Sequence, residues 1–451
     1  MEPILFKGYL ITGLIAWAVN LPLGYIRAGK PKFSPAWFFW IYISIPFIVY
    51  LPIAFGISRV FILVAVLLAV YGQIQGARFR AERMSSEEKD RLYQIPPTDS
   101  VNPGNIDDSK ILIALLNMGG PKTNSDVKDF LHRIFMDPRI IRFPLSGILQ
   151  PVFAWILVNA RWKAVAERYR QIGGGSPIYP STEAQVQALQ KELNRRGHDL
   201  HITYSFNYSR PLPEDTIREA QNNNKTHILP VSLYPHYSEA TTGSNMHYLE
   251  LAVKENAPAV AFLKAAVYYL HPGYIEAFAG RIREAVPEGE NLDDYYLLFS
   301  AHGLPLYFLK NGDQYPFQIA ETVGQILAKL RRQDNWSLSY QSDVGPLQWI
   351  KPSTEKMLEA LAERGITKLL VVPVSFVTDH IETLHEINIE YRELAEGAGI
   401  TDFRMSRAIE THPGFITALA DSVEKALGKT GGRPAAVGKA IQNSGISGTG
   451  R

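Results

Sequence analysis

The chain has 451 residues, with 46 basic and 44 acidic side chains, a hydrophobic fraction of 46% and no cysteine. This length exceeds that of one ordinary domain. A net charge of +2 lacks the basic excess of a dedicated nucleic-acid-binding protein. The missing cysteines exclude disulfide bonds, thiolate zinc sites, a cysteine-ligated iron–sulfur cluster and a cysteine nucleophile.

The charge is unevenly distributed along the chain. Residues 1–78 contain six basic residues and one acidic residue, for a net charge of +5. The remaining 373 residues contain 40 basic and 43 acidic residues, for a net charge of −3. The two parts are therefore predicted to face different environments.

Three uncharged stretches in the first part, residues 8–26, 33–58 and 60–77, each approach the length of a membrane-spanning helix. Basic residues follow the first and third stretches, so the positive-inside rule places the C-terminal body in the cytoplasm. We therefore predict an anchor of about three spans over residues 1–78, in contact with lipid of the inner, cytoplasmic membrane. A cleaved signal peptide is the alternative for the first stretch.

The rest of the chain divides by composition. Residues 79–109 are rich in charge and then in proline, which predicts a linker, and residues 428–451 are rich in small residues, which predicts a disordered tail. Residues 110–427 can bury a substantial core. This body alternates short apolar runs with segments of helical spacing, which predicts parallel sheets flanked by helices. The apolar runs are 111–116, 201–206, 227–231, 295–299, 338–341 and 369–374.

Two pairs of segments in this body have similar sequences. Residues 228–233 and 372–376 are both apolar runs that pass through Pro-Val-Ser, and residues 115–121 and 298–305 both end in small residues and proline. This repetition predicts an α/β fold with two related lobes. Loops at the carboxyl ends of their strands are expected to line a cleft between them.

His302 is the first candidate for chemistry. It follows an apolar run in Phe-Ser-Ala-His-Gly-Leu-Pro, residues 299–305. An imidazole at the carboxyl end of a strand can accept a proton near neutral pH or bind a divalent metal ion. The alternative is a structural histidine with all its hydrogen bonds satisfied.

The second candidate is the segment 378–390, which is rich in histidine and glutamate. His380 and Glu382 share a side if the chain is extended there, and Glu382, Glu386 and Glu390 form one stripe if a helix starts near Glu382. Histidine with carboxylates suits Fe²⁺ or Co²⁺. The alternatives are a helix cap and a solvated helix face.

These motifs jointly resemble the ferrochelatase family, whose members insert ferrous iron into a porphyrin to make haem. The resemblance covers residues 110–427 through seven ordered blocks, which are 116–121, 169–177, 234–244, 300–305, 312–316, 340–349 and 374–391. It implies two Rossmann-like lobes with parallel sheets around a porphyrin cleft. The N-terminal membrane region is an addition to the common family pattern.

The resemblance also implies residue roles. His302 matches the active-site histidine and is expected to accept protons, while Glu382, backed by His380, matches the active-site carboxylate. Metal contact is expected from His302, Glu382, Glu386 and Glu390. Porphyrin contact is expected from Met118, Arg161, Trp349, Phe376 and Tyr237, with Met118 typical of the protoporphyrin-using branch. Asn388 stands where the family usually has an acid.

The implied substrates are protoporphyrin IX and Fe²⁺, with no further cofactor and no nucleic-acid partner. A homo-oligomer and a contact with another protein of the haem pathway are left open. Two alternative functions also stay open: a chelatase for cobalt or for another tetrapyrrole, and a porphyrin or haem carrier without catalysis.

Overall fold

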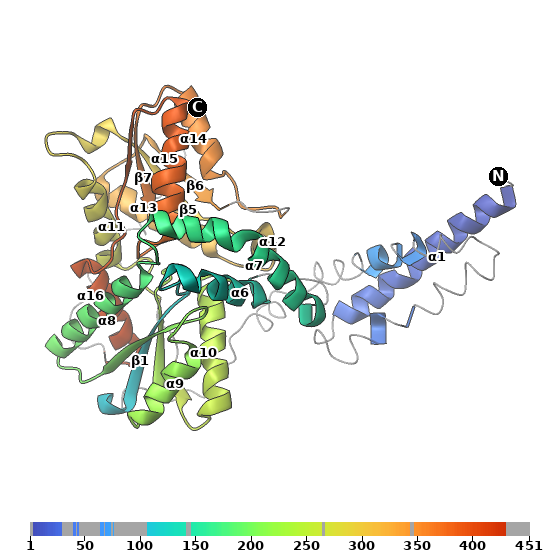
Figure 1. The fold of residues 1–451 in the computed structure, drawn as a ribbon, viewed down its shortest axis with the longest axis horizontal. Coiled ribbons are helices and arrows are strands. Elements are labelled where there is room, and N and C mark those ends of the chain that lie inside the picture. The colour runs from blue at the N-terminus through green and yellow to red at the C-terminus, as the bar shows by residue number, and fades with distance from the viewer. Residues whose placement is uncertain are drawn as a thin grey trace, which may run out of the picture. The chain divides into compact units, whose positions relative to one another are not determined.

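The computed structural model describes residues 3–28, 39–41, 43–44, 64–66, 68–73, 75, 106–140, 146–263, 267–342 and 347–429. The chain divides into two compact units, Met1–Asp99 and Ser100–Arg451 (Figure 1). The boundary between the units falls inside the predicted linker 79–109.

In the first unit, helix α1 (Pro3–Ala28) packs closely against helical residues near Gly72. A Cβ added to Gly24 would lie 2.2 Å from the carbonyl oxygen of Gln73, so only glycine allows this approach. Gln73 Nε2 also donates a hydrogen bond of 3.0 Å to Asn20 Oδ1 between the buried side chains. The contact therefore combines close backbone approach with a buried amide pair.

Among the residues that the structure describes, no helix is both long enough and apolar enough to cross a membrane. The first predicted span, 8–26, falls on α1, and its assignment as a span is not confirmed. This segment has no formal charge, yet it includes Asn20 and Thr12, which are polar and buried within the unit. The other two predicted spans, 33–58 and 60–77, lie largely or partly outside the described residues.

The first lobe of the second unit is a parallel four-stranded sheet with strand order β2-β1-β3-β4. Every residue of β1 is buried, because helices cover both faces of such a sheet. The strands are β1 (Ile111–Asn117), β2 (His201–Phe206), β3 (His227–Ser232) and β4 (Ala261–Phe262). The helices are η2 (Asp108–Lys110), η3 (Asn124–Asp126), α6 (Val127–Met136), α7 (Ser146–Gln171), α8 (Ile178–Arg195), α9 (Pro213–Asn222) and α10 (Thr242–Asn256).

The second lobe repeats this arrangement in the strand order β6-β5-β7-β8. Its strands are β5 (Tyr296–His302), β6 (Trp336–Gln341), β7 (Lys368–Pro373) and β8 (Asp402–Met405). The helices of this half of the chain are α11 (Pro272–Glu284), η4 (Leu292–Asp294), α12 (Leu306–Lys310), α13 (Tyr315–Leu330), α14 (Thr354–Glu363), η5 (Glu382–Tyr391), α15 (Arg392–Ala398) and α16 (Pro413–Ala426).

The two α/β lobes with parallel sheets confirm the α/β part of the predicted fold class, without its membrane region. β1 and β5 occupy equivalent positions in their sheets, as do β3 and β7. These are the two pairs of strands whose sequences echo each other. Figure 1 shows the sheets in separate halves of this unit, with α6 and α7 near their junction.

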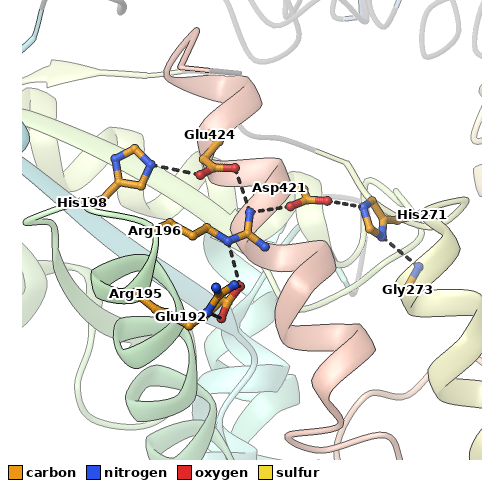
Figure 2. A network of polar contacts seen from close by, with 8 residues as sticks. All are labelled: Glu192, Arg195, Arg196, His198, His271, Gly273, Asp421 and Glu424. Carbon is orange, nitrogen blue, oxygen red and sulfur yellow. Dashed lines mark hydrogen bonds and ion pairs between the residues drawn. The ribbon is translucent and has the colours of Figure 1, made fainter. Parts of the chain in front are cut away.

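The C-terminal helix α16 returns to the first lobe and packs on α8 and α11. Its Phe415 is fully buried in a hydrophobic core that includes strand residues of both lobes. Arg196, just after α8, pairs with Asp421 and Glu424 of α16, while His271 at the start of α11 reaches Asp421 (Figure 2). The helix thus joins the lobes through both apolar and charged contacts.

Candidate functional site

A cleft of about 370 Å³ lies where the carboxyl ends of the two sheets face α6, α7 and η5. Ligand sites of α/β folds favour this location. Seven of the predicted site residues line the cleft, from both lobes: Met118, Arg161, His302, His380, Glu382, Glu386 and Glu390. The structure therefore brings these seven predicted residues together around one cleft.

His302 is the last residue of β5, and its side chain is half-buried in the cleft wall. Its Nδ1 atom is buried and has no hydrogen-bond partner among the described residues. Burial lowers the pKa of this imidazole, and the effect exceeds the opposing attraction of the Glu382 carboxylate. The ring is therefore neutral at pH 7 and can accept a proton.

His380 and Glu382 form a close pair at the start of η5. His380 Nδ1 lies 2.9 Å from Glu382 Oε2 and 3.2 Å from the backbone nitrogen of Glu382. Nδ1 can donate to the carboxylate or accept from the backbone N–H, but not both. Because its pKa is raised, we assign Nδ1 as the donor to the carboxylate.

The two pKa shifts agree on a charged pair. Burial lowers the pKa of His380, but the charge of Glu382 and its hydrogen bond together outweigh burial and raise the pKa above its ordinary value. Burial likewise favours the neutral form of Glu382, yet His380 and His302 lower the pKa of this carboxyl to about 2. Glu382 is therefore an anion inside the cleft at neutral pH.

η5 is a π-helix, whereas the sequence predicted an ordinary helical stripe from Glu382 onward. The helix begins at Glu382, as predicted. Glutamates spaced by four residues do not reveal the i→i+5 hydrogen bonds of a π-helix. π-helical turns are rare and are frequently found at functional sites. Glu382, Glu386 and Glu390 still share the cleft wall.

Glu386 is held by three donors. Its carboxylate accepts hydrogen bonds from the Ser342 backbone N–H at 2.9 Å, from the Ser342 hydroxyl, and from the Tyr391 hydroxyl at 2.8 Å. Burial raises the pKa of this carboxyl to about 7, because these hydrogen bonds only partly offset the burial. Glu386 therefore changes charge near neutral pH.

Glu390 ends the acidic stripe in an ion pair. Arg168 Nη2 on α7 lies 2.8 Å from Glu390 Oε1, and both side chains are partly exposed. The nearby His385 Nε2 lies 2.8 Å from Gln171 Oε1. These contacts link α7 to η5 beside the cleft.

Sequence reasoning did not single out Arg168 or His385, although both line the cleft. The spacing of Arg161, Val165 and Arg168 by four and three residues is a signal for one helix face. Nothing in the sequence distinguished His385 from a structural histidine.

Within the described ranges, no three or more histidine, aspartate and glutamate side chains lie close enough together to hold a metal ion. The four residues predicted to contact metal thus share the cleft without forming a ready-made three-ligand cluster there. Asn388 Oδ1 accepts a 2.8 Å hydrogen bond from Arg392 and is not among the residues that line the cleft.

Phe376 is buried between the two histidines of the site. Its ring lies edge-on to His380, with a centroid distance of 4.6 Å and an interplanar angle of 85°, and 6.2 Å from the ring of His302. It therefore fixes the rings that border the cleft rather than lining the cleft itself.

Trp349 and Tyr237 are also absent from the residues that line the cleft in its described part. Trp349 pairs with Pro305 in an isolated β-bridge and lies beside Gly303. The Tyr237 hydroxyl donates to Glu239 at 3.3 Å. The structure brings these two residues near the loops of the site but not into the cleft.

A family model and related sequences both indicate one family. Residues 110–427 match the family model described as Ferrochelatase. A Ferrochelatase from Gloeobacter violaceus is 40% identical over 323 residues, which cover 71% of this chain and 98% of that protein. A Ferrochelatase from a Nostoc species is 42% identical over 324 residues, which cover 71% and 83%. The solved sirohydrochlorin chelatase SirB of Bacillus subtilis subspecies spizizenii in complex with cobalt has 11% identity and a TM-score of 0.42, over 71% of this chain and 97% of that chain.

Proposed function

Since this chain belongs to the ferrochelatase family, we propose that it inserts Fe²⁺ into protoporphyrin IX, which is the last step of haem synthesis. The product is protohaem, and two protons leave the porphyrin. The observation that carries the proposal is the pairing of a neutral His302 with an anionic Glu382 in one cleft.

Metal insertion requires a base, because both pyrrole N–H protons must leave as the ion enters. A general base must lie within hydrogen-bond reach of the proton that it takes. His302 is neutral, borders the cleft and has a free buried Nδ1 within the described structure. We assign it as the proton acceptor.

Glu382 suits the delivery of the ion or the relay of the proton. Its carboxylate stays charged well below neutral pH because His380 lies 2.9 Å away. An anion inside a cleft attracts a divalent cation more strongly than one in water. Glu386 and Glu390 extend this acidic wall along η5.

To bind the macrocycle, the cleft needs apolar contacts with the ring and a cationic partner for its carboxylates. Met118 offers an apolar contact from the first lobe, and Arg161 offers a guanidinium that can pair with a propionate. Binding energy from such remote contacts can distort the ring toward the geometry in which its nitrogens face the ion. Met118 also supports protoporphyrin as the substrate. For Trp349 and Tyr237, porphyrin contact stays a prediction from the family resemblance.

The Soret band tests this function directly. Purified full-length protein is mixed anaerobically with Fe²⁺, or with Zn²⁺ as a stable substitute, and with protoporphyrin or coproporphyrin. Metallation of protoporphyrin supports the proposal. A preference for cobalt or for another tetrapyrrole would indicate the chelatase alternative, and binding without metallation would indicate a carrier.

His302→Ala supplies the matched variant. It should abolish turnover while porphyrin binding, followed by fluorescence quenching, stays close to that of the wild type. Near-normal turnover in this variant would refute the role of His302 as the base.

We also propose that residues 1–78 attach the catalytic body to the inner membrane, with that body in the cytoplasm. The support is the sequence pattern of uncharged stretches flanked by basic residues. Deleting residues 1–78 should release an active protein into the soluble fraction of lysed cells. Retention of the shortened chain in the membrane fraction would contradict the assignment.

A further inference from the structure

One block of the sequence has no role in the chemistry above. Residues 312–316, Gly-Asp-Gln-Tyr-Pro, span the end of the loop after α12 and the first two residues of α13. The Asp313 carboxylate accepts a 2.8 Å hydrogen bond from the Ser238 hydroxyl and a 2.9 Å bond from the Glu239 backbone N–H, both in the first lobe. Its other oxygen accepts the Tyr315 backbone N–H at 3.0 Å. Asp313 therefore ties the start of α13 to the first lobe.

Tyr315, the first residue of α13, reaches from this anchor to the candidate base. Its hydroxyl donates a 2.9 Å hydrogen bond to the backbone carbonyl oxygen of His302. The His302 backbone N–H donates to Ser375 Oγ at 2.9 Å.

These two bonds restrain both backbone polar groups of His302, its carbonyl oxygen and its N–H. They join the end of β5 to the start of α13 and to Ser375, the second residue after the end of β7.

The surroundings of Tyr315 keep its hydroxyl in place. The side chain is buried, and burial raises the pKa of its hydroxyl, so the proton needed for donation is retained. Its ring packs edge-on to His236, with centroids 6.1 Å apart. His236 is itself buried and bonded to Thr322 at 2.8 Å.

We infer that Tyr315 is a positioning residue for metal insertion: together with Ser375, it holds the main chain of His302 so that the imidazole meets the porphyrin nitrogens. This inference rests on the proposed role of His302 as proton acceptor. Asp313 carries the same restraint to the first lobe. The block 312–316 thus couples the placement of the base to the first lobe.

Tyr315→Phe tests the inference, because it removes one hydroxyl and keeps the buried ring. The full-length variant is assayed with protoporphyrin and Zn²⁺, and anaerobically with Fe²⁺. We expect kcat to fall by roughly 10- to 100-fold, the scale expected for a small misplacement of a catalytic group. KM and the dissociation constant for protoporphyrin should stay unchanged, because no contact that binds the ring is removed.

Tyr274→Phe is the matched control. Tyr274 is fully buried and also packs edge-on to His236, but its hydroxyl has no hydrogen-bond partner in the described structure. Its removal should leave kcat at the wild-type value. Equal kcat values in the two phenylalanine variants would overturn the inference.

Ser375→Ala removes the other hydrogen bond to the main chain of His302, and it decides the matter if Tyr315→Phe does not fold. We expect a similar loss of kcat, and a double variant no slower than the slower single variant, because both changes release the same segment of main chain. Independent, multiplying losses would show that the two hydroxyls act separately. An inactive wild type would instead refute the proposed function, so the two failures are distinguishable.

Discussion

The Glu382 carboxylate lies 2.9 Å from Nδ1 of His380, and each group changes the charge state of the other. The acid is held ionised, with a pKa of about 2, and the base is held protonated, with a pKa above its ordinary value. The pair thus places an anion in the cleft without leaving an uncompensated charge in the interior. A buried charge without a partner would be strongly unfavourable.

Glu382→Gln should therefore destabilise the protein in a pH-dependent way. A depressed carboxyl pKa contributes stability above the unfolded value of about 4.3, and this is lost as pH falls toward 2. The raised pKa of His380 contributes stability below about 6.5, and this is lost as pH rises through the folded value. The variant should therefore lose the most unfolding free energy between about pH 4.3 and pH 6.5, on the order of 3 kcal/mol. Urea denaturation from pH 3 to pH 9 measures it.

Glu390→Gln is the control for this series. Its partner Arg168 is partly exposed, so loss of the ion pair should change the free energy of unfolding by less than about 1 kcal/mol. If Glu382→Gln gave the same offset from wild type at every pH, the proton linkage between Glu382 and His380 would be disproved.

Glu386→Gln should have the opposite pH dependence. The pKa of Glu386 is raised to about 7, so the folded protein binds more protons than the unfolded chain between about pH 4.3 and 7. The protonated Glu386 side chain contributes its full share to the free energy of unfolding below this window. That contribution is lost as pH rises through the window. Relative to wild type, the glutamine variant should therefore gain stability with rising pH, on the order of 3–4 kcal/mol across the window. Parallel stability curves for the two proteins would contradict the raised pKa.

The sequence predicted the two lobes because their physical signals are local. Apolar runs such as 111–116 and 369–374 are buried on both sheet faces, and the repeated Pro-Val-Ser pattern marks equivalent strands. The sequence also predicts that His302 and Glu382 lie close together, since the carboxyl ends of parallel strands lie at one edge of the sheet. These features need no knowledge of distant side chains.

Other features depend on contacts that spacing cannot encode. The Tyr315 hydroxyl donates a hydrogen bond to His302, which is 13 residues away in the sequence. Arg196 donates one to Glu424, which is 228 residues away. The π-helical form of η5 depends on its tertiary setting, because a four-residue repeat of glutamates fits an ordinary helix equally well. An uncharged stretch such as 8–26 likewise does not reveal that Asn20 pairs with Gln73.

The charged network on α16 offers a test of how the C-terminal helix is held (Figure 2). Arg196 is 15% exposed and pairs with Glu192, Asp421 and Glu424. Arg196→Met should cost about 1.5–3 kcal/mol of unfolding free energy, because two carboxylates on α16 lose their shared donor. Neighbouring Arg195 is 70% exposed and pairs with Glu192 alone, so Arg195→Met should cost less than about 1 kcal/mol. Equal costs in urea denaturation would show that the network does not hold the helix.

The apolar side of α16 should contribute more than its charges. Phe415 is fully buried in the core shared by the two lobes, so Phe415→Ala should cost about 3–5 kcal/mol through lost burial and the resulting cavity. Phe317 on α13 is 63% exposed, and Phe317→Ala should change stability by less than about 0.5 kcal/mol. Because the core is shared, the Phe415 variant should unfold in a single transition seen equally by tyrosine fluorescence and far-ultraviolet circular dichroism. Separate transitions, with one lobe unfolding first, would show that α16 does not join the lobes into one cooperative unit.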